Sequence, residues 1–193
     1  LERRTSIQIC GQESDGATWV GMAGVYVGTP TSAWLDIAPT HRVTHMRFHE
    51  FFRVENGQVT EMQALWDIPA VMMQAGVWPM SPSLGREWNV LWSAKCDGLG
   101  PHDPKQSRVS EQIVIDMLGD MIRHPSEGGP EVMQLEKYWH PKMNWYGPAS
   151  IGTARGIDQF RRFHQIPFLS AMPDRGTHPV GIKHHFMAEG NYV

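Results

Sequence analysis

The chain has 193 residues, of which 41% are hydrophobic and 19% charged, with a net charge of −3. This length and composition are typical of one globular domain or two small ones, and the weak negative charge gives no electrostatic footprint for nucleic acid or for an anionic membrane surface. No apolar run approaches the ~18 residues that a membrane span requires. Two cysteines, Cys10 and Cys96, do not make a disulfide framework. They indicate a reducing cytoplasm, with a single optional disulfide as the alternative.

The segment up to about residue 70 is typical of β-strands. Its clearest local signal is Asn56-Gly57, which predicts a two-residue hairpin turn between two β-rich runs, because both central residues must adopt a positive φ. A loop of these two residues sets a register in which cross-strand partners share one face. That face is predicted to carry Met46, Phe48, Glu50, Phe52, Glu61, Gln63, Leu65 and Asp67, while His45 and His49 fall on the opposite face, in interface or surface roles.

The remainder of the chain changes character twice. A short helix is predicted from Ile68, and residues 76–109 are rich in Pro, Gly and Ser and predict a long linker. Ser110 is the expected N-cap of a helix that ends at His124-Pro125, and Pro130 begins a second short helix. A strand is expected at 142–147 and a helix from Gly156 that Pro167 must divide, and the terminal segment 184–193 is expected to be a strand that pairs near residue 17.

Four segments together resemble the SnoaL-like polyketide cyclases of the nuclear transport factor 2-like superfamily: "HEFFRVENGQVTEMQALWD…MMQAG", "MNWYGPASIGTARGIDQF", "PFLSAMPD" and "MAEGNYV". The resemblance implies an α+β fold, with a cone-shaped curved antiparallel sheet and helices packed on its concave face. It also implies that the family halves occur in exchanged order, since 1–75 resembles the C-terminal half and 110–193 the N-terminal half. The chain is then either a segment of a tandem protein or a permuted unit, closed within one chain or by exchange with a partner. A homodimer is expected because the resembled family commonly dimerises.

Asp67 is the first candidate catalytic residue. On a mainly apolar face a carboxylate is costly to keep charged, so its pKa is expected to rise toward the range useful for a general base. The resemblance implies the same role, acid/base catalysis of an intramolecular aldol cyclisation, although Gln63 stands where the family often has Trp. The alternative is a solvated Asp at a strand end. Glu50 and Glu61 could position substrate or pair with Arg42, Arg47 or Arg53.

His164 is the second catalytic candidate, because it lies one turn from Phe160 and Phe168 and could donate a hydrogen bond to an enolate; a core histidine is the alternative. No metal or cofactor is expected, since the chain shows no paired Cys, and His45 and His49, at i and i+4, lie roughly 13 Å apart on a strand, too far for one metal ion. We therefore expect a cofactor-free enzyme acting on a small apolar carbonyl compound, or else a non-catalytic binding or dimerisation module of the same fold. The predicted substrate pocket comprises Phe48, Glu50, Phe52, Gln63, Leu65, Trp145, Tyr146, Phe160 and Phe168.

Overall fold

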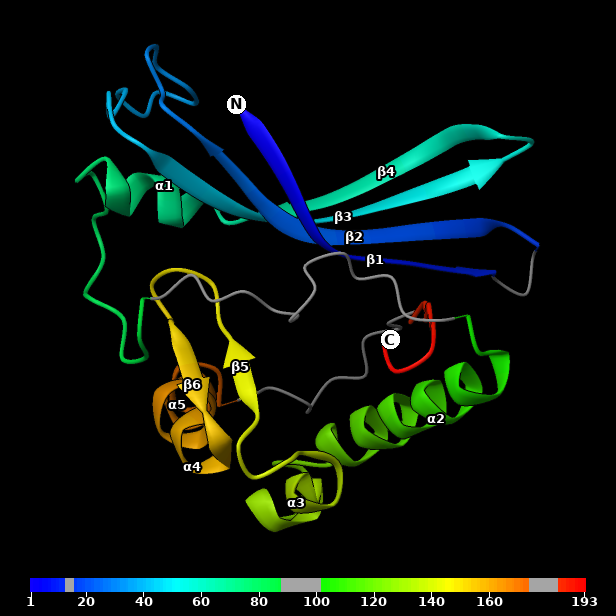
Figure 1. Cartoon of the computed structure of the whole chain (residues 1–193). Helices are drawn as coiled ribbons and strands as arrows, with labels where there is room; N and C mark the ends of the chain where they lie inside the picture. Colours follow the sequence, from blue (N-terminus) through cyan, green and yellow to red (C-terminus); the bar gives the residue numbers. More distant parts are fainter. Residues whose placement is uncertain (13–15, 88–101, 174–183) are drawn as a thin grey trace.

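The structure, a computed structural model, describes residues 1–12, 16–87, 102–173 and 184–193. Its largest element is a four-stranded antiparallel sheet in the order β1-β2-β3-β4. The strands are β1 (Glu2–Gln12), β2 (Thr18–Gly28), β3 (Thr44–Glu55) and β4 (Gln58–Trp66). The chain is thus α+β, and helices α2 to α5 and a small hairpin all lie on one side of this sheet (Figure 1).

The β3–β4 hairpin turns at Asn56 and Gly57, whose φ angles of 51° and 75° confirm the predicted two-residue turn. On the far side of the sheet from the helices, β1 bends sharply at a bulge between Thr5 and Ile7. Gly24 permits this bend, since a Cβ at that position would come within 2.1 Å of the Arg4 carbonyl oxygen. Any larger residue at this position would push β1 away from β2.

After β4, helix α1 (Ile68–Gln74) follows directly, as the sequence predicts. Helix α2 (Pro104–Met121) begins earlier than expected, because Asp103 and not Ser110 is its N-cap and accepts hydrogen bonds from the amides of Lys105 and Gln106. The expected linker 76–109 therefore overlaps the first turns of α2, and its residues 88–101 lie outside the described part of the chain.

The second half packs around its own core. The 3₁₀ turn η1 (Pro130–Met133) and helix α3 (Leu135–Tyr138) confirm the short helix predicted from Pro130, and β5 (Asn144–Tyr146) pairs with β6 (Thr153–Arg155). The predicted helix from Gly156 is divided into α4 (Gly156–Phe160), the π turn η2 (Arg161–Gln165) and α5 (Ile166–Ala171). The wide turn lies just before Pro167, whose ring cannot accommodate regular α-helical geometry with the residue four before it. Met133, Leu135, Ala154 and Phe160 form the buried centre of this half.

The terminal segment 184–193 is not the strand that the sequence predicts; among the residues that the structure describes, its only bridge joins Glu189 to Tyr192. It nevertheless lies at the expected place. A Cβ on Gly11 would come within 2.9 Å of Met187, and the His185 ring lies 6.2 Å from that of Trp19. Ser110 of α2 holds the segment by donating to the Gly190 carbonyl at 2.8 Å. Contact with the sheet is therefore made by side chains instead of a strand ladder.

These contacts define two faces of the sheet. We call the face that carries Trp19, Gly21, Arg47 and Asp67 the inner face, because segments of the second half pack on it. The outer face carries Tyr26, Phe48, Glu50 and Trp66. No helix in the described part of the chain is long and apolar enough to cross a membrane.

Candidate active site

Asp67 lies on the inner face because of a bulge in β4. Near the turn the register is as predicted, with Val54 opposite Val59 and Glu55 opposite Gln58. Between Arg53 and Val54 it shifts by one residue, so that Phe48 faces Trp66 instead of Leu65. The shift transfers the rest of β4 to the other face, because side chains alternate along a strand. The prediction that Asp67 shares a face with Phe48, Glu50 and Phe52 is therefore wrong.

The Asp67 carboxylate is held by an ion pair with Arg47. Both Nε and Nη2 of Arg47 donate to Oδ2, at 3.1 and 2.7 Å, and the two side chains are only 13% and 6% exposed for Arg47 and Asp67. The Asp67 amide in turn donates to the Arg47 carbonyl, which continues the β3–β4 ladder. Buried charges of opposite sign that are hydrogen-bonded in this way fix each other's position.

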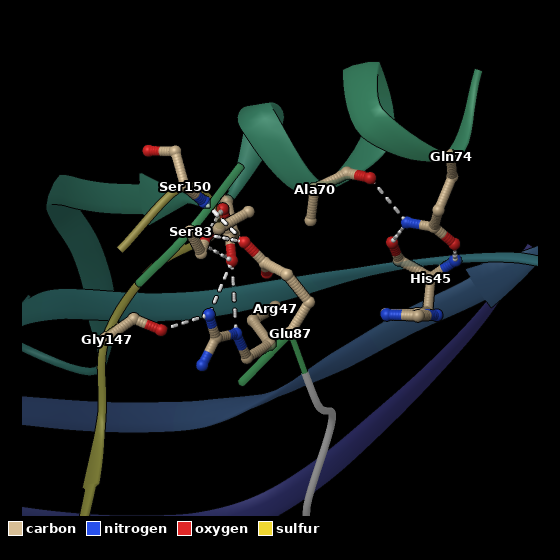
Figure 2. A network of polar contacts seen from close by, with 10 residues as sticks. His45, Arg47, Ala70, Gln74, Ser83, Glu87, Gly147 and Ser150 are labelled. Atoms are coloured by element: carbon tan, nitrogen blue, oxygen red, sulfur yellow. Dashed lines mark hydrogen bonds and ion pairs between the residues drawn. The ribbon is translucent and has the colours of Figure 1, made fainter. Parts of the chain in front are cut away.

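The loop between β5 and β6 completes the setting of Asp67. The Ala149 amide donates to Oδ1 and Oδ2 at 3.2 and 3.1 Å, and Arg47 Nη2 also donates to the Gly147 carbonyl at 2.6 Å. The next amide, that of Ser150, donates to Glu87 at 2.8 Å, and Figure 2 shows Arg47, Gly147, Ser150 and Glu87 converging. Two successive amides of this loop thus bind carboxylates from distant parts of the chain.

The loop can reach this position because of its glycines. Gly152 has a φ of +84°, and a Cβ there would lie 2.5 Å from the Gly85 carbonyl carbon. This close approach lets residues 85–86 pair with β6, through hydrogen bonds between Arg86 and Thr153 and from the Gly85 amide to the Ile151 carbonyl. The chain before the undescribed segment is thereby attached to the hairpin.

These elements enclose a cavity of about 330 Å³, which we call the Asp67 cavity. Its charged or titratable side chains come from three places: β3, Asp67 (the N-cap residue of α1), and residues 85–87. The lining residues are His45, Arg47, Asp67, Ala70, Met73, Gln74, Arg86, Glu87, Gly147, Ala149, Gly152 and Thr153. The cavity is therefore small and rich in polar groups.

His45 is positioned by Gln74 of α1. The Gln74 side chain accepts from the His45 amide at 3.0 Å and donates to the His45 carbonyl at 2.7 Å, as a neighbouring strand would (Figure 2). Burial, with the positive charge of Arg47, lowers the pKa of His45 against the opposing effect of Asp67. The imidazole is therefore neutral near pH 7, so one ring nitrogen can donate and the other accept a hydrogen bond.

The predicted residues of the helical half form a separate aromatic cluster. The His164 ring stacks on Trp145 at 4.3 Å and lies 5.4 and 5.3 Å from Phe160 and Phe168, which confirms that it faces an apolar surface. His164 and Phe168 line a different cavity, of about 290 Å³, with Leu84 and Ile151 among its other lining residues. Tyr146 lies beside Trp145 in β5. The structure therefore does not bring His164 into the Asp67 cavity.

The predicted pocket residues of the hairpin also lie elsewhere. Phe48 and Glu50 are buried on the outer face, at 0% and 2% exposure, and Phe52 is half-buried on the same face. Gln63 and Leu65 are exposed on β4. None of the five lines the Asp67 cavity. Glu50 pairs with Arg3, at 2.8 Å, and not with the arginines considered for it.

Sequence reasoning missed His45, Arg47 and Arg86 as neighbours of Asp67. The sequence does show that His45 and Arg47 share one face of β3, because they are two residues apart. It does not show that Asp67 lies on that face, since this depends on the bulge in β4. The prediction that His45 and His49 lie opposite Asp67 is wrong for the same reason. Among the described residues there is no group of three or more His, Cys, Asp or Glu side chains that could hold a metal ion.

Comparison with known proteins relates part of the chain to a family model. Residues 4–75, which comprise the sheet and α1, match the family model described as SnoaL-like polyketide cyclase. Neither the curated proteins nor the solved structures include a significant match to the chain. The segment that carries Asp67 and its partner Arg47 thus lies in the part of the chain that is similar to the SnoaL-like polyketide cyclases.

Proposed function

We propose that the protein is a cofactor-independent enzyme of the SnoaL type, in which Asp67 transfers a proton at the carbon next to a substrate carbonyl. The observation that carries the proposal is the placement of Asp67. It lies at the end of the last strand of a SnoaL-like segment and lines a cavity, and Arg47 and Ala149 hold its carboxylate in one orientation. A fixed carboxylate in a cavity is what a general base requires.

The two carboxylate oxygens have different surroundings. Oδ2 accepts both hydrogen bonds from Arg47 and shares the Ala149 amide, whereas among the described contacts Oδ1 accepts only from Ala149. Oδ1 therefore has room to accept a proton. Because Arg47 donates two hydrogen bonds to the other oxygen, rotation of the carboxylate is restricted and Oδ1 keeps one orientation.

The proposed reaction needs only groups of this chain. Asp67 removes a proton from the carbon next to one carbonyl, and the C–H electrons form an enolate. The enolate carbon then bonds to a second carbonyl carbon of the same molecule, and the resulting alkoxide takes the proton back from Asp67. His45, neutral near pH 7, and Arg86 line the same cavity and would stabilise the enolate oxygen, in the role expected of His164.

The test follows proton transfer itself, because the natural substrate need not be known. Small aryl methyl ketones and β-diketones are incubated in D₂O, and exchange of their α-protons is followed by NMR. The wild-type protein should accelerate exchange, and D67N should lower the accelerated rate about 10²–10⁴-fold. E61Q, which alters an exposed carboxylate of the same strand, is the control. Equal exchange by D67N and wild type, compared at temperatures where both are folded, would overturn the proposal.

A second candidate function is a non-catalytic module that binds a small molecule. One observation favours it: Asp67 is only 6% exposed and is already hydrogen-bonded, as a purely structural ion pair would be. In that case D67N would lose stability, and wild type and variant would leave exchange of the ketones equally unchanged.

We also propose that residues 1–75 and 110–193 are the two halves of one cone-shaped SnoaL fold in exchanged order, joined by the 76–109 region. The hydrogen bond from Arg47 to the Gly147 carbonyl, that from the Ala149 amide to Asp67, and the packing of Met187 on Gly11 support this arrangement. A cytoplasmic homodimer, with or without exchanged segments, remains part of the proposal. A solution mass for the purified protein tests the dimer, and a monomer at micromolar concentration would contradict it.

A further inference from the structure

The outer face of the sheet carries a second cavity, larger than the Asp67 cavity and separate from it. It measures about 500 Å³ and lies between the loop 29–43, the first strand positions of β3 and the end of β4. We call it the outer cavity. Its lining residues are Leu1, Tyr26, Gly28, Thr29, Pro30, Ser32, Trp34, Ile37, Ala38, Thr40, Thr44, His45, Met46, Trp66 and Val71.

The loop 29–43, which forms one wall of the outer cavity, is held together by hydrogen bonds between its own backbone groups. The His41 amide donates to the Pro30 carbonyl at 3.1 Å, and the backbones of Trp34 and Ile37 exchange two hydrogen bonds at 3.1 and 2.9 Å. Leu35 and His41 adopt left-handed conformations, with φ of 49° and 51°, that non-glycine residues occupy at a cost. The backbone path of this loop is therefore constrained.

The floor of the outer cavity is formed by the rings of Tyr26 and Trp66, and the buried carboxylate of Glu50 holds both rings in place. Oε1 of Glu50 accepts from the Tyr26 hydroxyl at 2.7 Å and from the Trp66 indole at 3.1 Å. Its other oxygen accepts from Arg3, whose guanidinium also lies 4.5 Å from the centre of the Phe48 ring. The polar atoms of Tyr26 and Trp66 thus bond to Glu50, which does not line the cavity. The two residues therefore present mainly their aromatic rings to the cavity.

The chemistry of the lining indicates the kind of molecule that fits. No side chain that lines the outer cavity carries a fixed charge, and His45 is neutral near pH 7. The polar groups of the lining include the hydroxyls of Ser32 and of threonines, among which the Thr40 and Thr44 hydroxyl oxygens are 2.6 Å apart. A charged ligand would lose its hydration without gaining a charged side chain as its partner, whereas flat apolar rings would contact Trp34, Trp66 and Ile37.

We propose that the outer cavity is a binding site for an uncharged, mainly apolar small molecule with a flat ring system. The volume is in the range of small-molecule sites, and a constrained wall and a fixed aromatic floor are typical of a largely pre-formed pocket. The site does not depend on Asp67, which lies on the inner face. His45 alone lines both cavities, so the outer cavity does not rest on the proposed acid/base function.

The test uses two fluorescent probes of similar size and different charge. N-phenyl-1-naphthylamine is uncharged, and 8-anilinonaphthalene-1-sulfonate carries a sulfonate. Saturable binding of the uncharged probe to the wild-type protein, at least about tenfold tighter than binding of the sulfonate, is expected. A38W places an indole at the cavity wall and should weaken the uncharged probe at least about tenfold. A33W, on the same exposed loop but outside the lining, should bind it as the wild type does.

Three results would overturn the proposal: no saturable binding of the uncharged probe, equal binding of both probes, or equal effects of A38W and A33W. The solution mass is measured in the same samples. If A38W converts a dimer to a monomer while wild type fails to bind the probe, a second copy of the chain occupies the cavity and the proposal is wrong. D67N should leave probe binding unchanged, so failure of this site and failure of the acid/base proposal are distinguishable.

Discussion

Replacing Asp67 by Asn is expected to cost stability because the carboxylate joins the sheet to the β5–β6 loop. The variant keeps the shape of the side chain but removes the charge that faces Arg47, and its amide group opposes either the Arg47 or the Ala149 donor. Removing one member of a buried ion pair typically costs about 3–5 kcal/mol. Since Arg47 is 13% exposed and keeps its bond to Gly147, we expect the lower end, about 3 kcal/mol.

Urea unfolding followed by circular dichroism measures this cost. For a chain of this length, about 3 kcal/mol corresponds to a fall in Tm of roughly 6–12 °C. E61Q, the exposed control on β4, should change the free energy of unfolding by less than about 0.5 kcal/mol.

A double-mutant cycle with R47M isolates the ion pair. D67N/R47M should be destabilised by less than the sum of the two single variants, because the second substitution removes the charge that the first left unpaired. If D67N lies within about 0.5 kcal/mol of wild type, or the two costs simply add, then the Arg47–Asp67 pair does not hold the loop to the sheet and this reasoning is refuted.

Two further predictions concern the same sheet. Burial alone raises the pKa of Glu50, but hydrogen bonds from Tyr26, Arg3 and Trp66 outweigh it and the pKa is lowered from its usual value. Glu50 therefore contributes stability that is present above about pH 4.3 and is lost as the pH falls through its lowered pKa. The unfolding free energy of wild type should fall more steeply than that of E50Q on acidification below pH 4.3, and parallel curves would contradict this. Q74L should cost about 1–3 kcal/mol and remove hydrogen-exchange protection of the His45 amide, because it leaves the His45 backbone groups unpaired. Unchanged protection would show that Gln74 does not close this edge of β3, and Q63L at an exposed position is the control.

Local signals predicted most of the elements. The four strands, the Asn56-Gly57 turn, α1, the Pro130 helix and β5 each follow from a short pattern that the structure confirms. The start of α2 was also readable, because Asp103-Pro104 is an N-cap followed by a residue suited to the first helical position. It was missed because the surrounding Pro and Gly residues suggested a linker.

The site was harder to predict for a physical reason. A bulge inserts one residue without any marker in the sequence, and it decides which face of the sheet every later residue of β4 occupies. The amide of Ala149 reaches Asp67 across 82 positions of the chain, through tertiary packing alone. The outer cavity likewise depends on how a loop folds over the sheet. The identity of Asp67 as a candidate could thus be inferred, but its face and its partners could not.

The central claim is that the reacting part of the substrate meets the Asp67 carboxylate. The most direct measurement is a ligand-bound crystal structure with a phenol, since its ring-attached hydroxyl imitates an enol. The account predicts the phenol oxygen within hydrogen-bond distance of Asp67 Oδ1, with His45 and Arg86 beside it. A phenol bound without contact to Asp67, in the outer cavity or near His164, would contradict the claim.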